Sequence, residues 1–179
     1  MRLRPFASEQ EYSDLKEQLH VEPNDYWGAW WHPRAKTKKD FEETGMLNAD
    51  KYSTFAVERL DTNELVGLEE YGGTASGRCN AWIGTFISRE HWHNGFGIEA
   101  KQLCLCHIFE NFQVPRVEAD TLENHQRAAR GLHLCGMKFE GRAKKYHYMD
   151  GHYYDIVCYR IFREEWEQQP FRHGVKRGL

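Results

Sequence analysis

The sequence predicts one mixed α+β domain, in which a mostly antiparallel sheet of about seven strands packs against about four helices. Three observations support this prediction. Polar and apolar residues alternate with a period of two in stretches between residues 53 and 87, which is typical of strands. A long, largely apolar run over 97–112 has the length of a helix. Near the C-terminus, Asp150-Gly151 separates two further alternating stretches and so predicts a hairpin.

The N-terminal part of the chain is expected to supply an edge strand and two helices. Residues 1–6 alternate as a strand would. Ser8 and Glu11 have the spacing of a capping box, which predicts a helix over 8–20. The polar stretch 36–45 predicts a second helix that ends at Gly45.

The middle of the chain is expected to form an antiparallel meander followed by one βαβ unit. The three predicted strands are 53–60, 64–71 and 80–87, and the links between them suit antiparallel returns. The helix at 97–112 and a strand at 116–122 then complete a βαβ unit that begins at residue 80.

The last helix and the hairpin complete the domain. Asn124 is a candidate N-cap, and Gly136 suits the left-handed position that ends a helix. The expected domain covers residues 1–166, and residues 167–179 are expected to be a basic C-terminal tail.

Composition excludes several classes of function. A formal net charge of −3 gives no reason to expect a nucleic-acid partner, and no run of about 18 apolar residues predicts a membrane span. The five cysteines include no CxxC pair, so we expect buried free thiols in a reducing cytoplasm and a cytoplasmic location. A zinc site at Cys104, Cys106 and His107 would lack a second ligand pair, so no metal is expected.

Two glycines precede the long central helix in "HWHNGFGIEA", residues 91–100. The first amides of a helix have no acceptor within the helix, and together with the helix dipole they attract an anion. Glycine at Gly95 and Gly97 would let a phosphate group approach the backbone closely.

Two alternatives stay open for this loop. "GFGIEA" also fits G-x-G-x-x-A, the dinucleotide fingerprint, with Asp120 where a ribose-binding acid is expected. Against it, residues 88–94 separate the strand from the first glycine, and the preceding strands do not alternate with helices. The second alternative is a glycine-containing loop that binds no ligand, because a lone G-x-G is a weak signal.

The loop, together with the order of elements, resembles the GNAT superfamily of N-acetyltransferases. "WHNGFGIEA" is similar to that family's pyrophosphate loop R/Q-x-x-G-x-G/A, with Trp92 in the R/Q position. The tryptophan, and the segment from Glu123 to Ile161 with its Asn, Gly-Met-Lys-Phe and Asp-Gly features, resemble the branch that acetylates ribosomal-protein N-termini.

The resemblance implies that acetyl-CoA is the co-substrate. Strands 4 and 5 of the sheet would splay apart below the loop, so that the pantetheine arm can pair with the fourth strand. Asn124 would hydrogen-bond the pantetheine, and its simpler interpretation is a plain N-cap. The implied cofactor-binding residues are Ile87, Ser88, Asn94, Gly95, Phe96, Gly97, Ile98 and Asn124.

Acetyl transfer also needs a base for the amine and a proton donor for the departing sulfur. The predicted bases are Glu69 and Glu70, and the predicted acid is Tyr153, with Tyr146 and Tyr148 as further candidates. A solvated strand end for the glutamates and cross-strand packing for the tyrosines are the structural alternatives. Trp27, Trp30 and Trp31 are expected near the acceptor, or else to pack a helix onto the sheet.

The predicted function is direct transfer of an acetyl group from acetyl-CoA to a primary amine in a ternary complex, by a monomer or a homodimer. The acceptor would be a protein N-terminus or a small molecule such as a polyamine. The alternative is a catalytically silent acyl-CoA sensor or scaffold. It is motivated by the absence of a carboxylate from strand 80–87, and by Arg127 at the position where the ribosomal-protein branch often has serine.

Overall fold

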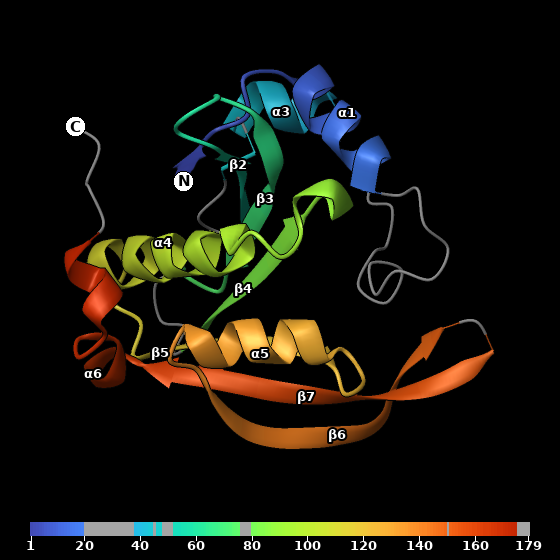
Figure 1. Cartoon of the computed structure of the whole chain (residues 1–179), viewed down its shortest axis with the longest axis vertical. Coiled ribbons are helices and arrows are strands. Elements are labelled where there is room, and N and C mark those ends of the chain that lie inside the picture. The colour runs from blue at the N-terminus through green and yellow to red at the C-terminus, as the bar shows by residue number, and fades with distance from the viewer. Residues whose placement is uncertain (20–37, 45, 48–51, 76–79, 150, 175–179) are drawn as a thin grey trace.

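A computed structural model describes residues 1–19, 38–44, 46–47, 52–75, 80–149 and 151–174, and it contains a seven-stranded sheet with the order β1-β2-β3-β4-β5-β7-β6 (Figure 1). The strands are β1 (Arg2–Arg4), β2 (Tyr52–Glu58), β3 (Leu65–Gly72), β4 (Asn80–Ile87), β5 (Arg116–Leu122), β6 (Lys138–Met149) and β7 (His152–Phe162). The helices of these residues are α1 (Glu9–Leu19), α3 (Lys38–Thr44), α4 (Phe96–Asn111), α5 (Gln126–Leu134) and α6 (Arg163–Trp166), with 3-10 turns at Arg89–His91 and Pro170–His173.

Every pair of neighbouring strands is antiparallel except β4 and β5. Those two are parallel and pair over three positions, from Asn80 with Arg116 to Trp82 with Glu118. Beyond Trp82 the two strands separate. The predicted α+β fold and the splay between the fourth and fifth strands are therefore confirmed.

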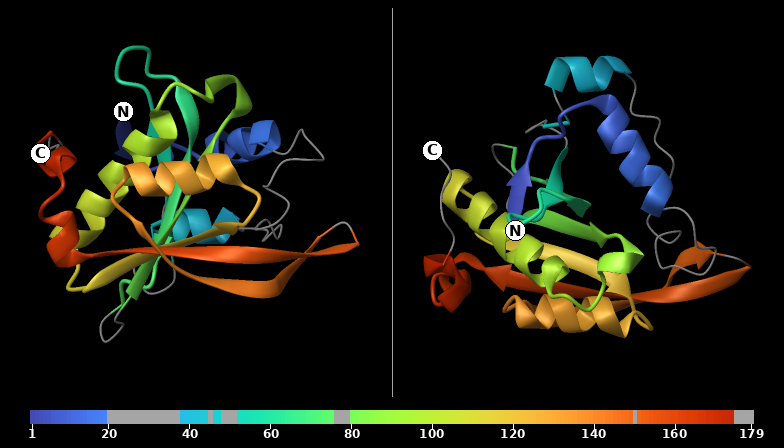
Figure 2. Two further views of the ribbon diagram at one scale, coloured as in Figure 1. Left: turned by 60° about the horizontal axis from the view of Figure 1, so that its bottom comes forward. Right: turned by 45° about the horizontal axis from the view of Figure 1, so that its top comes forward.

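Helices cover both faces of the sheet (Figure 2). Adjacent residues of a strand point to opposite faces, and Phe55 and Ala56 of β2 show this directly. Phe55 belongs to the core against α4, whereas Ala56 belongs to the core against α1. Because α1 and α4 pack on opposite faces, an opening in the sheet connects two separate surfaces of the molecule.

Helix α4 is the best-buried helix and positions the loop before it. It begins at Phe96, and its buried residues are Ala100, Cys104, Leu105, Cys106, Ile108 and Phe109. The apolar side chains of this run are buried because α4 packs between the sheet and α5. No helix among the described residues is long and apolar enough to cross a membrane.

The cap predictions for α5 are half right. The N-cap is His125 rather than Asn124, and no side chain accepts a capping hydrogen bond there. At the other end, Gly136 has φ +80°, and the amides of Gly136 and Met137 donate to His133 and Leu132 at 2.9 and 3.1 Å. This is a Schellman motif, so the predicted left-handed glycine is confirmed.

Part of the chain after residue 166 packs against the hydrophobic core. Trp166 is buried and stacks on Phe109 with ring centroids 5.1 Å apart, and Phe171 packs against the same core. The domain boundary after residue 166 stays a prediction. Of the four cysteines in the described part of the chain, Cys104, Cys106 and Cys135 are buried free thiols.

Candidate active site

A cavity of about 1130 Å³ occupies the opening between β4 and β5. Its walls include Ile83–Ile87 of β4 and Ala119–Thr121 of β5. The start of α4 and one side of α5 form the wall on one face of the sheet, and Tyr12 and Lys16 of α1 reach it on the other face. The cavity therefore runs through the sheet.

The two glycines of the loop lie at one mouth of this cavity. Gly95 is the N-cap of α4 in the left-handed conformation (φ +81°), and a Cβ atom on it would meet nothing within 4 Å. Its carbonyl oxygen accepts from the amides of Ile98 and Glu99 at 3.0 and 3.1 Å. The amides of Phe96 and Gly97 lie in the first turn and have no carbonyl one turn earlier in the helix to accept from them, so they point outward along its axis.

Trp92 fixes the loop against the end of β4. Its indole Nε1 donates to the carbonyl oxygen of Ile87 at 2.7 Å, and the guanidinium carbon of Arg127 lies 3.3 Å from its ring centroid. The side chain of Asn94 donates to the carbonyls of His91 and Trp92 at 3.2 and 3.1 Å, so that side chain stabilises the loop itself.

Two hydrogen bonds at the end of β4 determine which backbone groups of this strand a pantetheine could use. The amide of Ser88 donates to Val66 of β3 at 2.9 Å, and the carbonyl of Ile87 already accepts from Trp92. The backbone N–H and C=O groups of successive residues point to opposite sides of a strand. The backbone groups of Ser88 point toward β3, so those of Ile83 and Thr85 point into the opening. Pairing of the pantetheine with Ile87 and Ser88 stays a prediction, and it would compete with these two bonds.

The two predicted bases lie on opposite faces of β3. Glu70 is half-buried, lines the cavity on the α1 side and accepts from Thr54 Oγ1 at 3.2 Å. Glu69 is 0% exposed and faces α4. Burial raises the pKa of Glu69 to about 8, against the opposing effect of the charge on Lys101. The alternative of a solvated strand end is therefore wrong for Glu69.

Several predicted site residues do not line the cavity. Tyr153 is 66% exposed on the β6–β7 hairpin, and its ring packs on that of Tyr148 with centroids 5.0 Å apart. The hairpin extends beyond the helices (Figure 1), which carries Tyr153 away from the slot. Asn124 precedes α5 outside the cavity wall, and its carbonyl accepts from Gln126 at 3.0 Å. Trp27, Trp30 and Trp31 lie outside the described residues.

Sequence reasoning missed the acidic wall on the α1 side. Trp82, Glu118 and Asp120 line the cavity there, together with Glu70. The signal was present in "RVEADTL", because the period of two places Glu118 and Asp120 on one face of β5, opposite Val117 and Ala119.

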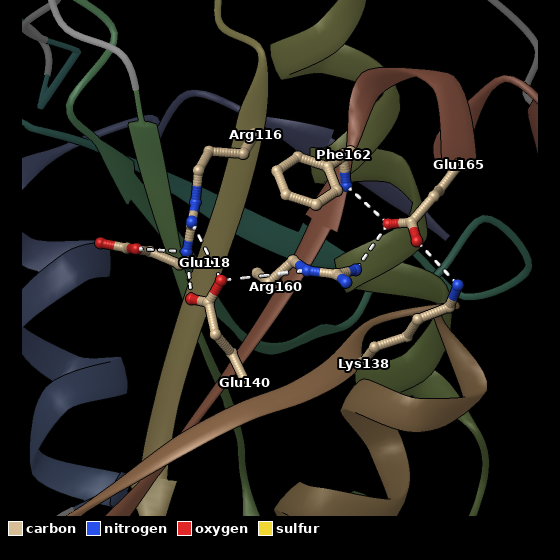
Figure 3. Close-up of polar contacts among 7 residues, drawn as sticks. All are labelled: Arg116, Glu118, Lys138, Glu140, Arg160, Phe162 and Glu165. Carbon is tan, nitrogen blue, oxygen red and sulfur yellow. Dashed lines mark hydrogen bonds and ion pairs between the residues drawn. The ribbon is translucent and has the colours of Figure 1, made fainter.

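An ion-pair network neutralises one of these carboxylates (Figure 3). Arg116 pairs with Glu118 at 3.2 Å and also with Glu140. The network continues through Arg160, Glu165 and Lys138. Asp120 forms no ion pair with any described residue, and Lys16 of α1 is a basic residue that lines the same side of the cavity.

His125 and Lys101 are two further titratable residues of the cavity wall that were not predicted. Burial, together with the positive charges of Arg127 and Lys101, lowers the pKa of His125 to about 4, so its imidazole is neutral near pH 7. Its Nδ1 lies 3.3 Å from Thr121 Oγ1. Within the described ranges, no group of three or more His, Cys, Asp and Glu side chains could hold a metal ion.

Comparison with known proteins now decides the family. The family model described as an acetyltransferase (GNAT) domain matches residues 1–138. The chain belongs to the GNAT acetyltransferase family. The resemblance identified from the glycine loop is confirmed at this level, whereas the ribosomal-protein branch is not.

The curated relatives of this GNAT chain are named as uncharacterized N-acetyltransferases. One is YoaA of Bacillus subtilis (strain 168), 31% identical over 109 residues. Another is p20 of Bacillus licheniformis, 23% identical over 112 residues. The matches span 61% and 63% of this chain and only 62% and 63% of those proteins.

Solved structures share the fold of this chain at low sequence identity. A spermidine N-acetyltransferase from Vibrio cholerae in complex with CoA and spermine superimposes with a TM-score of 0.74 at 19% identity, covering 93% of this chain and 98% of that one. The smu.2055 protein of Streptococcus mutans UA159 gives 0.67 at 17% identity, covering 91% and 99%.

Proposed function

We propose that this chain transfers the acetyl group of acetyl-CoA to a primary amine of a small, positively charged molecule. The observation that carries the proposal is the cavity through the sheet between β4 and β5, with the glycine loop at one mouth and carboxylates at the other. Family membership supports acetyl-CoA as the donor.

The coenzyme would enter from the α4 side. Its diphosphate would lie against the amides of Gly95, Phe96 and Gly97, where the helix dipole favours negative charge. The pantetheine arm would extend between the separated strands and pair with backbone groups of β4, as an added strand does. This arrangement brings the thioester to the middle of the sheet.

The acceptor would enter from the α1 side. Glu70 and Asp120 supply negative charge there, and Trp82 offers an aromatic face to a cation. Such a wall suits an amine with a second positive charge better than an uncharged one. The spermine complex of the Vibrio cholerae enzyme is consistent with this acceptor class.

The chemistry assigns a role to Glu70. An alkyl ammonium must lose a proton before its nitrogen can attack the thioester carbonyl, and Glu70 is the carboxylate on the acceptor side of β3. A backbone amide of β4 would stabilise the oxyanion. The attacking nitrogen would then lose its second proton to solvent, and the thiolate of coenzyme A would leave and take up a proton from solvent. Glu69 faces the other side of the strand and is not required for this step.

Release of the coenzyme thiol, measured with a panel of amines, tests the proposal. We expect turnover with spermidine and putrescine that exceeds turnover with a peptide bearing a free N-terminus. Faster turnover of the peptide would overturn the assigned acceptor class and favour a protein N-terminus. Tight coenzyme binding with no turnover on any amine would favour the silent acyl-CoA sensor.

A further inference from the structure

Lys101 lies in the gap between α4 and α5, directly behind the glycine loop. Its Nζ donates to the carbonyl oxygen of Gly97 at 3.3 Å. It lies between the two facing helices, where a Cβ atom on Gly97 or Gly131 would make an ordinary van der Waals contact with Nζ at 3.9 or 4.0 Å. Lys101 also lines the cavity. An ammonium group is therefore built into the wall beside the amides proposed to hold the diphosphate.

Glu69 of β3 lies on the same side of the sheet as α4. It is completely buried, and its two carboxyl oxygens have no donor at hydrogen-bonding geometry within the described residues. Burial raises the pKa of Glu69 to about 8, so this side chain is mostly uncharged near pH 7 and supplies no counter-charge there. Burial also lowers the pKa of Lys101.

The other groups that face Lys101 do not cancel its charge. Arg127 of α5 adds a second positive charge, and Cys104 of α4 and Cys135 after α5 are nearby thiols. Burial raises the pKa of both thiols, so they stay neutral near pH 7. His125 is neutral there as well. On this side Lys101, Arg127 and Arg130 are basic side chains of the cavity wall.

We propose that Lys101 is a positioning residue for the coenzyme: its ammonium attracts the anionic diphosphate from behind the glycine loop. The inference rests on the proposed function, because it takes the diphosphate to bind at Gly95–Gly97. It goes further by assigning part of the phosphate recognition to a side chain that lies outside the loop motif.

The first test compares two ligands that differ in their phosphates. Calorimetry would give the Kd of coenzyme A and of pantetheine, which lacks every phosphate, for the wild type and for Lys101→Met. We expect Lys101→Met to raise the Kd of coenzyme A by about tenfold and the Kd of pantetheine by less than about twofold. Lys144→Met, an exposed hairpin lysine with the same change of net charge, is the matched control and should leave both constants unchanged.

A second measurement checks folding. Thermal melting of each unliganded variant shows whether it is folded.

The outcomes separate the two levels of proposal. A wild-type protein that does not bind coenzyme A would refute the proposed coenzyme site itself. Wild-type binding with an unaltered Kd in Lys101→Met would overturn only the role of Lys101. Equal losses for coenzyme A and pantetheine would also overturn it, because they would indicate a distorted slot rather than a lost phosphate contact.

Discussion

The indole nitrogen of Trp92 donates a hydrogen bond to the carbonyl oxygen of Ile87 at 2.7 Å. This bond ties the loop before α4 to the last residue of β4. Arg127 of α5 stacks on the same ring, so one side chain links three elements around the mouth of the cavity. A tryptophan at this motif position therefore shapes the loop.

Replacing Trp92 with phenylalanine should loosen that mouth. The ring still supports Arg127, but the carbonyl of Ile87 loses its donor, which should cost about 1 kcal/mol of unfolding free energy. Coenzyme A affinity should fall several-fold. Urea denaturation and a coenzyme titration measure the two effects. Arg127→Gln, which keeps the indole bond, should reduce stability less. A Trp92→Phe protein that equals the wild type in both measurements would contradict this account.

The two loop glycines should respond differently to alanine. Gly97 lies in the helix, so alanine there should raise helix stability by about 0.5–1 kcal/mol. Its Cβ would nevertheless sit 3.4 Å from Ile87 Cγ1, at the edge of the slot, and should obstruct the coenzyme. A Cβ atom at Gly95 would contact no atom, but alanine is strained at φ +81°. Gly95→Ala should therefore lower the unfolding free energy by about 1–2 kcal/mol. Thermal melting with and without coenzyme A distinguishes these outcomes; full coenzyme affinity in Gly97→Ala would count against the proposed slot.

The slot between β4 and β5 could be predicted because the family resemblance implies it, and the signals that carry the resemblance are local. The order of the elements and the glycine spacing before a long helix are both visible in the chain. The roles of Glu69 and Glu70 were harder, because alternation shows only that they face opposite sides of β3. Which side is buried depends on how α4 packs. Likewise, the Asp150-Gly151 turn predicted the hairpin that carries Tyr153. The distance of Tyr153 from the cavity depends on how far β6 and β7 extend beyond the other strands, which the turn does not show.

Glu69 should make the stability of the protein depend on pH. Its pKa in the folded state is about 8, raised from 4.5 by burial, so the folded protein holds this proton more tightly than the unfolded chain does. The stabilising contribution is complete below about pH 4.5 and is lost as pH rises through 8. Relative to Glu69→Gln, the wild type should lose unfolding free energy on the order of a few kcal/mol between pH 5 and pH 8.5.

Chemical denaturation at the two pH values measures that difference. Glu70→Gln, the same substitution on the other face of β3, is the control. The pH dependence of its unfolding free energy should stay closer to that of the wild type. The lowered pKa of Lys101 acts in the opposite direction at higher pH, so the comparison ends at pH 8.5. Parallel pH profiles for the wild type and Glu69→Gln would show that Glu69 is not buried as described.

Glu70 should control the rate of transfer. If it removes the proton from the amine, Glu70→Gln should lower kcat by about 100-fold or more, with little change in the KM for acetyl-CoA. Steady-state thiol release with spermidine at several pH values gives both constants. The deficit should shrink at high pH, where the amine is already neutral in solution. A kcat within about twofold of the wild type would remove Glu70 from the mechanism.

Asp120 should determine how well a charged acceptor binds. Its carboxylate faces the cavity without an ion pair among the described residues, whereas Glu118, two residues earlier on the same face of β5, is paired with Arg116. Asp120→Asn should therefore raise the KM for spermidine by about tenfold, while Glu118→Gln should raise it less. The kcat should change little in Asp120→Asn, because the residue attracts the acceptor and takes no proton from it. With a monoamine acceptor that lacks a second charge, the effect of Asp120→Asn should be smaller. Equal KM changes for Asp120→Asn and Glu118→Gln would show that the ion pair with Arg116 does not neutralise Glu118 toward the acceptor.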